Sequence, residues 1–112
     1  SEREVAADVE AALRQAGFER PAFETIVASG PNSALPHARP SGRVLEAGEG
    51  VVLDFGGVYD GYCVDLTRMA VVGRGSEAFA RMVEGVRGAQ QAAIDRLRPG
   101  ARARRRPARC RG

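Results

Sequence analysis

The dipeptide Asp60–Gly61 constrains the fold of this chain most, because it is a strong signal for a tight two-residue hairpin turn. It lies inside "GEGVVLDFGGVYDGYCVDLTRMAVVG", a stretch rich in β-branched and aromatic residues that is typical of two strands. If Asp60–Gly61 forms the turn, Tyr59 faces Tyr62 and the register of the whole hairpin is set. The sequence therefore predicts an antiparallel strand pair at the centre of the fold.

This register assigns the hairpin residues to two faces. Asp54 faces Thr67 and Gly56 faces Asp65, so the two aspartates are diagonal neighbours on one face. The same face also carries Val58 and Cys63. The opposite face, which we expect to pack on the core, carries Leu53, Phe55, Tyr62, Val64 and Leu66.

The aspartate pair has three interpretations. Gly56 is expected to leave an empty volume between the two carboxylates, and two like charges at short range repel one another unless a cation lies between them. Carboxylate oxygens suit hard divalent ions, and Thr67 could hydrogen-bond a ligand carboxylate. Alternatively, both aspartates point into solvent from the wet face of a half-exposed sheet, or they share one proton.

The remaining pattern predicts a mixed α/β (α+β) domain over residues 1–100. Ser1 and Glu4 form an S-x-x-E capping box ahead of an amphipathic helix expected over residues 2–16. Residues 22–30 alternate as a strand. A second amphipathic helix is expected over residues 76–97 and ends at Pro99–Gly100.

His37, the only histidine, lies in the loop expected over residues 30–42, which contains three prolines. Loops of this length within a compact domain are often functional. A single loop histidine is nevertheless an ordinary surface residue in most proteins, so spacing alone assigns it no role. Cys63 could be a soft metal ligand, but we expect it to be a small buried residue.

The basic residues are unevenly distributed. All 17 are arginines, and six of them lie in residues 101–112, "ARARRRPARCRG", which contain no acidic residue. One interpretation is an arm that binds nucleic acid through phosphate attraction. We favour the other: G/C-rich codons read in the wrong frame yield this composition, so residues 101–112 are expected to be an aberrant or disordered tail.

Two features bear on the cellular setting. The chain has no apolar run near the ~18 residues of a membrane helix, and no secretory signal. Cys63 and Cys110 form neither a disulfide framework nor a zinc motif. We therefore expect a cytoplasmic protein without a membrane partner.

Three motifs occur in a specific order: "SGPNSALPH", then "DFG", then "DLTR". In this order and spacing the sequence resembles the Xaa-Pro peptidases of metallopeptidase family M24, over roughly residues 2–100. The resemblance implies a partial pita-bread fold, the N-terminal half of the catalytic domain. "ALPHARP" looks like the branch that acts on proline dipeptides. The implied activity is hydrolysis of Xaa-Pro bonds at the N-terminus of peptides or in dipeptides.

The resemblance also assigns residues. Asp54 matches an aspartate that binds one metal ion, and Asp65 matches the aspartate that bridges two. His37 matches a loop histidine that contacts the substrate without binding metal. The implied cofactors are two divalent ions, manganese first, with cobalt or zinc as alternatives, and together they activate a water for attack on the peptide carbonyl. The implied partner is a peptide with proline at its second position, and a homo-oligomer of the full-length protein is left open.

The sequence also departs from this family. The M24 site is completed by one histidine and two glutamates, but this chain has no histidine after His37 and no glutamate after Glu84. We therefore expect a fragment that is inactive alone. The alternatives are a non-catalytic pita-bread binding module and, less favoured, an arginine-tailed nucleic-acid-binding protein.

Overall fold

The computed structural model describes residues 1–101. The chain divides into two compact units, Ser1–Phe79 and Ala80–Gly112, and the first contains all the described strands. No helix in the described range is both long and apolar enough to cross a membrane. The expected tail over residues 101–112 lies, from residue 102 onward, outside the described residues.

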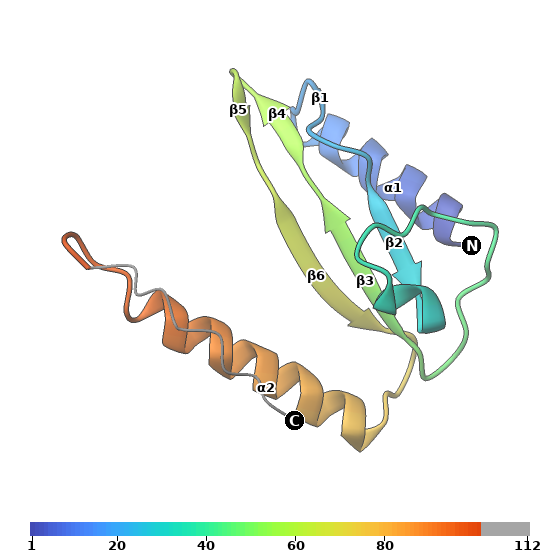
Figure 1. Ribbon diagram of the computed structural model, residues 1–112. Coiled ribbons are helices and arrows are strands. Elements are labelled where there is room, and N and C mark those ends of the chain that lie inside the picture. The colour runs from blue at the N-terminus through green and yellow to red at the C-terminus, as the bar shows by residue number, and fades with distance from the viewer. Residues whose placement is uncertain (102–112) are drawn as a thin grey trace. The chain divides into compact units, whose positions relative to one another are not determined.

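Helix α1, Glu2–Gln15, confirms the first expected helix. Its capping box is present, because the Ser1 side chain accepts from the backbone of Glu4 while the Glu4 side chain returns to Ser1. The helix lies along β2 (Figure 1) and buries Ala6 against the sheet. Buried and partly buried apolar side chains form one small core, composed of Val5, Ala6, Val27, Leu45, Val51, Leu53 and Val72.

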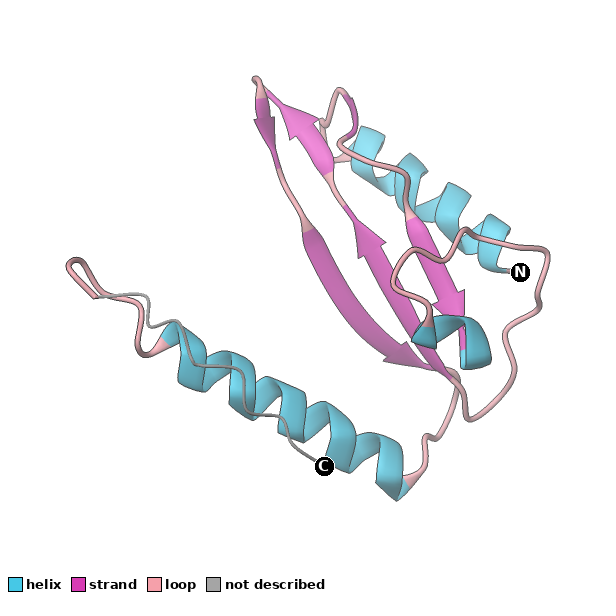
Figure 2. Cartoon of the chain, in the orientation of Figure 1, coloured by secondary structure: helices cyan, strands magenta, loops and turns pink. Residues whose placement is uncertain are grey.

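The strands form two antiparallel three-stranded sheets (Figure 2). The order in one is β1-β4-β5 and in the other β2-β3-β6. The elements are β1 (Arg20–Pro21), β2 (Ile26–Ser29), the 3-10 helix η1 (Gly30–Ala34), β3 (Gly50–Phe55), β4 (Gly57–Tyr59), β5 (Tyr62–Cys63) and β6 (Leu66–Val71). The expected strand over residues 22–30 is therefore shorter than its alternating pattern, and the short strand β1 was not predicted.

The predicted hairpin register is confirmed. Tyr59 pairs with Tyr62 across the turn, and Asp54 pairs with Thr67 at the far end. The turn residue Asp60 has φ 47°, in the left-handed region that aspartate tolerates better than most residues. The hairpin is divided into four strands, because the ladder is interrupted between β3 and β4 and between β5 and β6.

The predicted burial of the hairpin is only partly right. Leu53 packs on the core as expected, but Tyr62 is 78% exposed and Leu66 is 37% exposed. Cys63, expected to be buried, is also exposed. The physical reason is position: α1 packs on β1 and β2, and β5 and β6 lie at the opposite edge of each sheet.

Helix α2, Glu77–Ile94, begins where the sequence predicts and ends a few residues earlier. Ser76 precedes it, and its Oγ accepts from the backbone N–H of Phe79 at 3.1 Å. The helix has no buried residue. The helix is thus amphipathic in sequence, but many of its apolar side chains are exposed, among them Met82, Val86 and Ile94.

Candidate metal centre

Asp54 lies in the middle of a row of three side chains on one face of the β2-β3-β6 sheet. It pairs with Ile26 on one side and with Thr67 on the other, and directly paired residues share a face. Thr67 donates from Oγ1 to Oδ1 of Asp54 at 2.9 Å. Within the described residues this is the one hydrogen bond to the Asp54 carboxylate, so Oδ2 is available to a ligand.

Asp65 immediately precedes β6, and its side chain is exposed. The intact register on both sides places it opposite Gly56. The expected empty volume at Gly56 is wrong, because a Cβ there would lie 1.9 Å from the carbonyl oxygen of Val64 and 2.8 Å from the ring of Phe23. Glycine at this position allows close approach of two main chains. An ion shared by the two carboxylates would therefore have to lie on their solvent side and not at Gly56.

The two aspartates fit part of a divalent-metal site. Both offer carboxylate oxygens, which hard divalent ions prefer, and Thr67 orients one of them. Among residues 1–101, however, no group of three or more His, Cys, Asp or Glu side chains is placed to hold a metal. Asp54 and Asp65 would therefore supply only some of the ligands of an ion.

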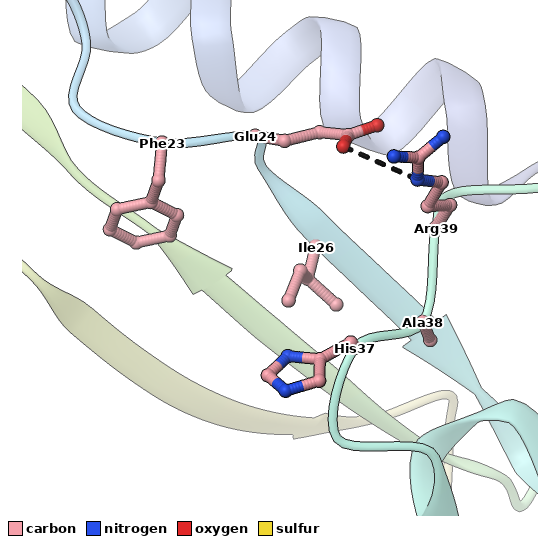
Figure 3. A pocket seen from close by; sticks show the side chains of 6 residues that line it. All are labelled: Phe23, Glu24, Ile26, His37, Ala38 and Arg39. Carbon is pink, nitrogen blue, oxygen red and sulfur yellow. Dashed lines mark ion pairs between the residues drawn. The ribbon is translucent and has the colours of Figure 1, made fainter.

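His37 is exposed and lies in the loop that follows η1. It lines a shallow hollow of about 290 Å³ together with Phe23 and Ile26. Figure 3 shows the His37 and Ile26 side chains on the same side of β2, with the ion pair between Glu24 and Arg39 nearby, at 3.5 Å. Because Ile26 pairs with Asp54, the hollow borders the face that carries Asp54.

Glu2 is the notable residue that the sequence analysis missed. It is fully buried, and its carboxylate accepts hydrogen bonds from Ser29, Asn32 and Ser41. Burial alone would raise the pKa of Glu2, but these hydrogen bonds outweigh it and lower the pKa to about 2. An acidic residue in the first turn of a helix is ordinary, so the sequence offered little signal for this role.

Arg43 extends this polar network toward β3. Its Nη1 donates to Ser29 Oγ at 2.8 Å and to Glu49 Oε2 at 2.6 Å. Hydrogen bonding between the two side chains raises the pKa of Arg43 and lowers that of Glu49. Gly30, with φ 49°, is needed beside this pair, because a Cβ there would lie 2.2 Å from Glu49 Oε1.

Comparison with known proteins gives a match along nearly the whole chain. The profile of metallopeptidase family M24 matches residues 1–111. The chain belongs to metallopeptidase family M24. The M24 chain is 46% identical over 99 residues to the Xaa-Pro dipeptidase of Pyrococcus furiosus, an alignment that covers 88% of this chain and 28% of that relative. The chain thus spans little more than a quarter of the length of the curated relatives it matches.

Solved structures confirm the partial pita-bread fold. The M24 chain matches the X-Pro aminopeptidase of Thermotoga maritima with a TM-score of 0.85 and 42% identity, over 88% of this chain and 28% of that one. It matches the dipeptidase PepE of Mycobacterium ulcerans with a TM-score of 0.85 and 42% identity, over 89% and 27% of the two chains. The mixed α/β (α+β) class expected from the sequence is therefore confirmed.

Proposed function

We propose that this M24 chain carries two metal ligands, Asp54 and Asp65, and the substrate-side histidine, His37, of an Xaa-Pro peptidase. The observation that supports this best is the intact register of β3 and β6, which sets Asp54 between Thr67 and Ile26. That row borders the hollow lined by His37. The relatives named above, an Xaa-Pro dipeptidase and an X-Pro aminopeptidase, suggest the reaction: hydrolysis of the bond that precedes proline.

The chemistry of the two carboxylates suits this role. Asp54 and Asp65 would hold divalent ions, for which we propose manganese first, with cobalt or zinc as alternatives. When bound, such ions would polarise the carbonyl group of the substrate and lower the pKa of a bound water. Thr67 holds one oxygen of Asp54 and thereby orients the other. Both carboxylates are retained, which favours a peptidase over a non-catalytic binding module.

His37 would act on the substrate and not on the metal. Its exposed imidazole can donate a hydrogen bond to the carbonyl oxygen of the bond to be cleaved. The apolar side chains of Phe23 and Ile26 line the same hollow and offer a surface for an apolar part of a peptide. We propose as substrate a peptide with proline at its second position, in a cytoplasmic protein, with the oligomeric state left open.

The metal site can be tested by titrating Mn²⁺ into the 112-residue chain by calorimetry. We expect weak binding, because two carboxylates leave most of the coordination to water. The heat should disappear in Asp54→Asn and in Asp65→Asn. The matched control is Asp60→Asn, which alters an exposed aspartate of the same hairpin at a turn position that asparagine accepts. Equal heats from all four proteins would overturn the proposed site.

A further inference from the structure

The part of the His37 loop that follows η1 has few internal backbone hydrogen bonds. The whole loop runs from the end of β2 to Ser41 and contains three prolines, which have no backbone N–H. Beyond the hydrogen bonds within the 3-10 helix η1, the described backbone hydrogen bonds inside it are those of Leu35 to Asn32 at 3.0 Å and of Ala38 to Leu35 at 3.2 Å. A segment of this kind needs contacts from elsewhere in the chain to hold one conformation.

The Glu2 carboxylate supplies contacts at both ends of the loop, and the backbone N–H of Arg3 adds one to the Ser41 carbonyl oxygen at 3.2 Å. Oε1 accepts from the backbone N–H and the Oγ of Ser29, each at 2.8 Å, at the start of the loop. Oε2 accepts from the backbone N–H of Ser41 at 3.0 Å and from its Oγ at 2.6 Å, at the end. Asn32 Nδ2 reaches both oxygens, at 3.1 and 3.3 Å. Figure 1 shows the N-terminal end of α1 beside this loop.

The contacts require a carboxylate in particular. Every group that faces Glu2 in this set donates a hydrogen bond, and an ionised carboxylate only accepts. Arg43 fixes the direction at Ser29, since its Nη1 donates to Ser29 Oγ and leaves that hydroxyl to donate to Glu2. Glutamine has the same shape, but its NH₂ group would face another donor at one end of the loop.

We propose that Glu2 is a positioning residue: by joining Ser29, Asn32 and Ser41 it holds the loop of residues 30–41 in place and so sets the position of His37. We call this set of hydrogen bonds the Glu2 clamp. The contacts alone account for the fixed conformation of the loop. The importance of this conformation for catalysis rests on the role proposed above for His37.

Amide hydrogen exchange, measured by NMR on the complete 112-residue chain, tests the clamp. In Glu2→Gln, the amides of Leu35 and Ala38 should exchange faster by about tenfold or more, while those of β3 should exchange faster only as far as the loss of global stability measured by urea unfolding requires. The control is Glu4→Gln, which removes an exposed carboxylate from the same turn of α1 and should leave the loop unchanged. Wild-type exchange in the loop of Glu2→Gln, with or without an increase in β3, would overturn the proposal.

Ser41→Ala provides a second variant, because it removes one tie at the end of the loop and leaves Glu2 in place. Its effect should be confined to residues 36–41, and it decides the question if Glu2→Gln does not fold. If Glu2→Gln does not fold and the loop amides of Ser41→Ala exchange at the wild-type rate, the clamp is refuted.

The His37 ring gives a more direct signal. Its imidazole resonances should shift and average toward those of a free histidine in Glu2→Gln but stay at their wild-type positions in Glu4→Gln. A mere loss of stability would not move them in the folded fraction. Unmoved resonances in Glu2→Gln would count against the clamp.

The clamp and the proposed function can fail separately. Glu2 does not contact Asp54 or Asp65 among its hydrogen bonds, so the heat of Mn²⁺ binding should persist in Glu2→Gln. If the wild-type chain binds no Mn²⁺ while the loop still loosens in Glu2→Gln, the metal site is refuted and the clamp stands. If Mn²⁺ binds but the loop amides of Glu2→Gln exchange at the wild-type rate, the clamp is refuted and the metal site stands.

Discussion

Thr67 on β6 donates its hydroxyl hydrogen to Oδ1 of Asp54, the residue directly opposite on β3, at 2.9 Å. The bond joins two strands whose register is set by a turn several residues away. It holds the Asp54 carboxylate in one orientation on the face of the sheet, with Oδ2 available to a ligand. The Thr67 side chain, which looks like that of an ordinary strand residue, thereby orients the metal ligand proposed above.

Replacement of Thr67 by valine is expected to weaken Mn²⁺ binding by about tenfold, because the Asp54 carboxylate loses the donor that orients it. Thr67→Ser keeps the hydroxyl and should bind nearly as the wild type does. Paramagnetic broadening of the Asp54 and Asp65 amide signals during an Mn²⁺ titration measures the affinity of each variant. Identical broadening in Thr67→Val and the wild type would show that the hydrogen bond has no part in the site.

The 112-residue chain alone is expected to have no peptidase activity. Hydrolysis by two ions requires both to be fixed close together, and the described residues contain no group of three or more His, Cys, Asp or Glu side chains placed to hold a metal. The assay is proline release from Ala-Pro and from a longer Xaa-Pro peptide in the presence of Mn²⁺. Release above the metal-only blank that disappears in Asp65→Ala would mean that another group completes the site.

Gly56→Ala is expected to destabilise the fold by about 1–3 kcal/mol, because the added methyl group would collide with the carbonyl oxygen of Val64. Val64 is held nearby by its backbone hydrogen bond to Gly57 at 2.9 Å, so it cannot move away freely. Gly42→Ala is the matched control, since nothing lies within 4 Å of a Cβ there. Urea unfolding of the three proteins gives the comparison, and equal midpoints would contradict the close contact.

The stability of the chain should depend on acid through Glu2. Its folded pKa of about 2 lies below the ordinary value of 4.5, so the ionised form is favoured in the folded state. The resulting stabilisation, roughly 3 kcal/mol, is fully present above pH ~4.5 and is lost as the pH falls through ~2.

Urea unfolding at a series of pH values, in the wild type and in Glu2→Gln, measures this dependence. The difference between the two proteins should shrink as the pH falls from 5 to 2. Acids that Glu2 does not influence, such as Glu4, contribute equally to both proteins and cancel in the difference. A difference that does not change with pH would show that Glu2 is not ionised in the fold.

The parts of the fold that depend on short sequence patterns could be predicted. The turn at Asp60–Gly61 sets its register locally, and the capping box sets the start of α1, so both were found from the sequence. Burial could not be read in the same way. Tyr62 and Leu66 alternate as core residues do, yet they are exposed, because burial depends on which edge of the sheet α1 covers.

The candidate site shows the same division. Asp54 and its partner Thr67 followed from the register, whereas the space at Gly56 was judged wrongly because the approach of Val64 is a tertiary contact. Glu2 was missed for a related reason. Its partners, Ser29 and Ser41, lie 27 and 39 residues away in sequence, and no local pattern connects them to it.

The sequence distance between Glu2 and Ser41 also has a kinetic consequence. Closing a long loop costs chain entropy before its stabilising contacts form, whereas helix α1 and the hairpin turn are made from residues close together in sequence. The loop that bears His37 can be held only after the first helix has docked against β2 and the chain has returned to it. We expect the surroundings of this histidine to be among the last parts of the unit to form during refolding, and among the first to open when it is strained.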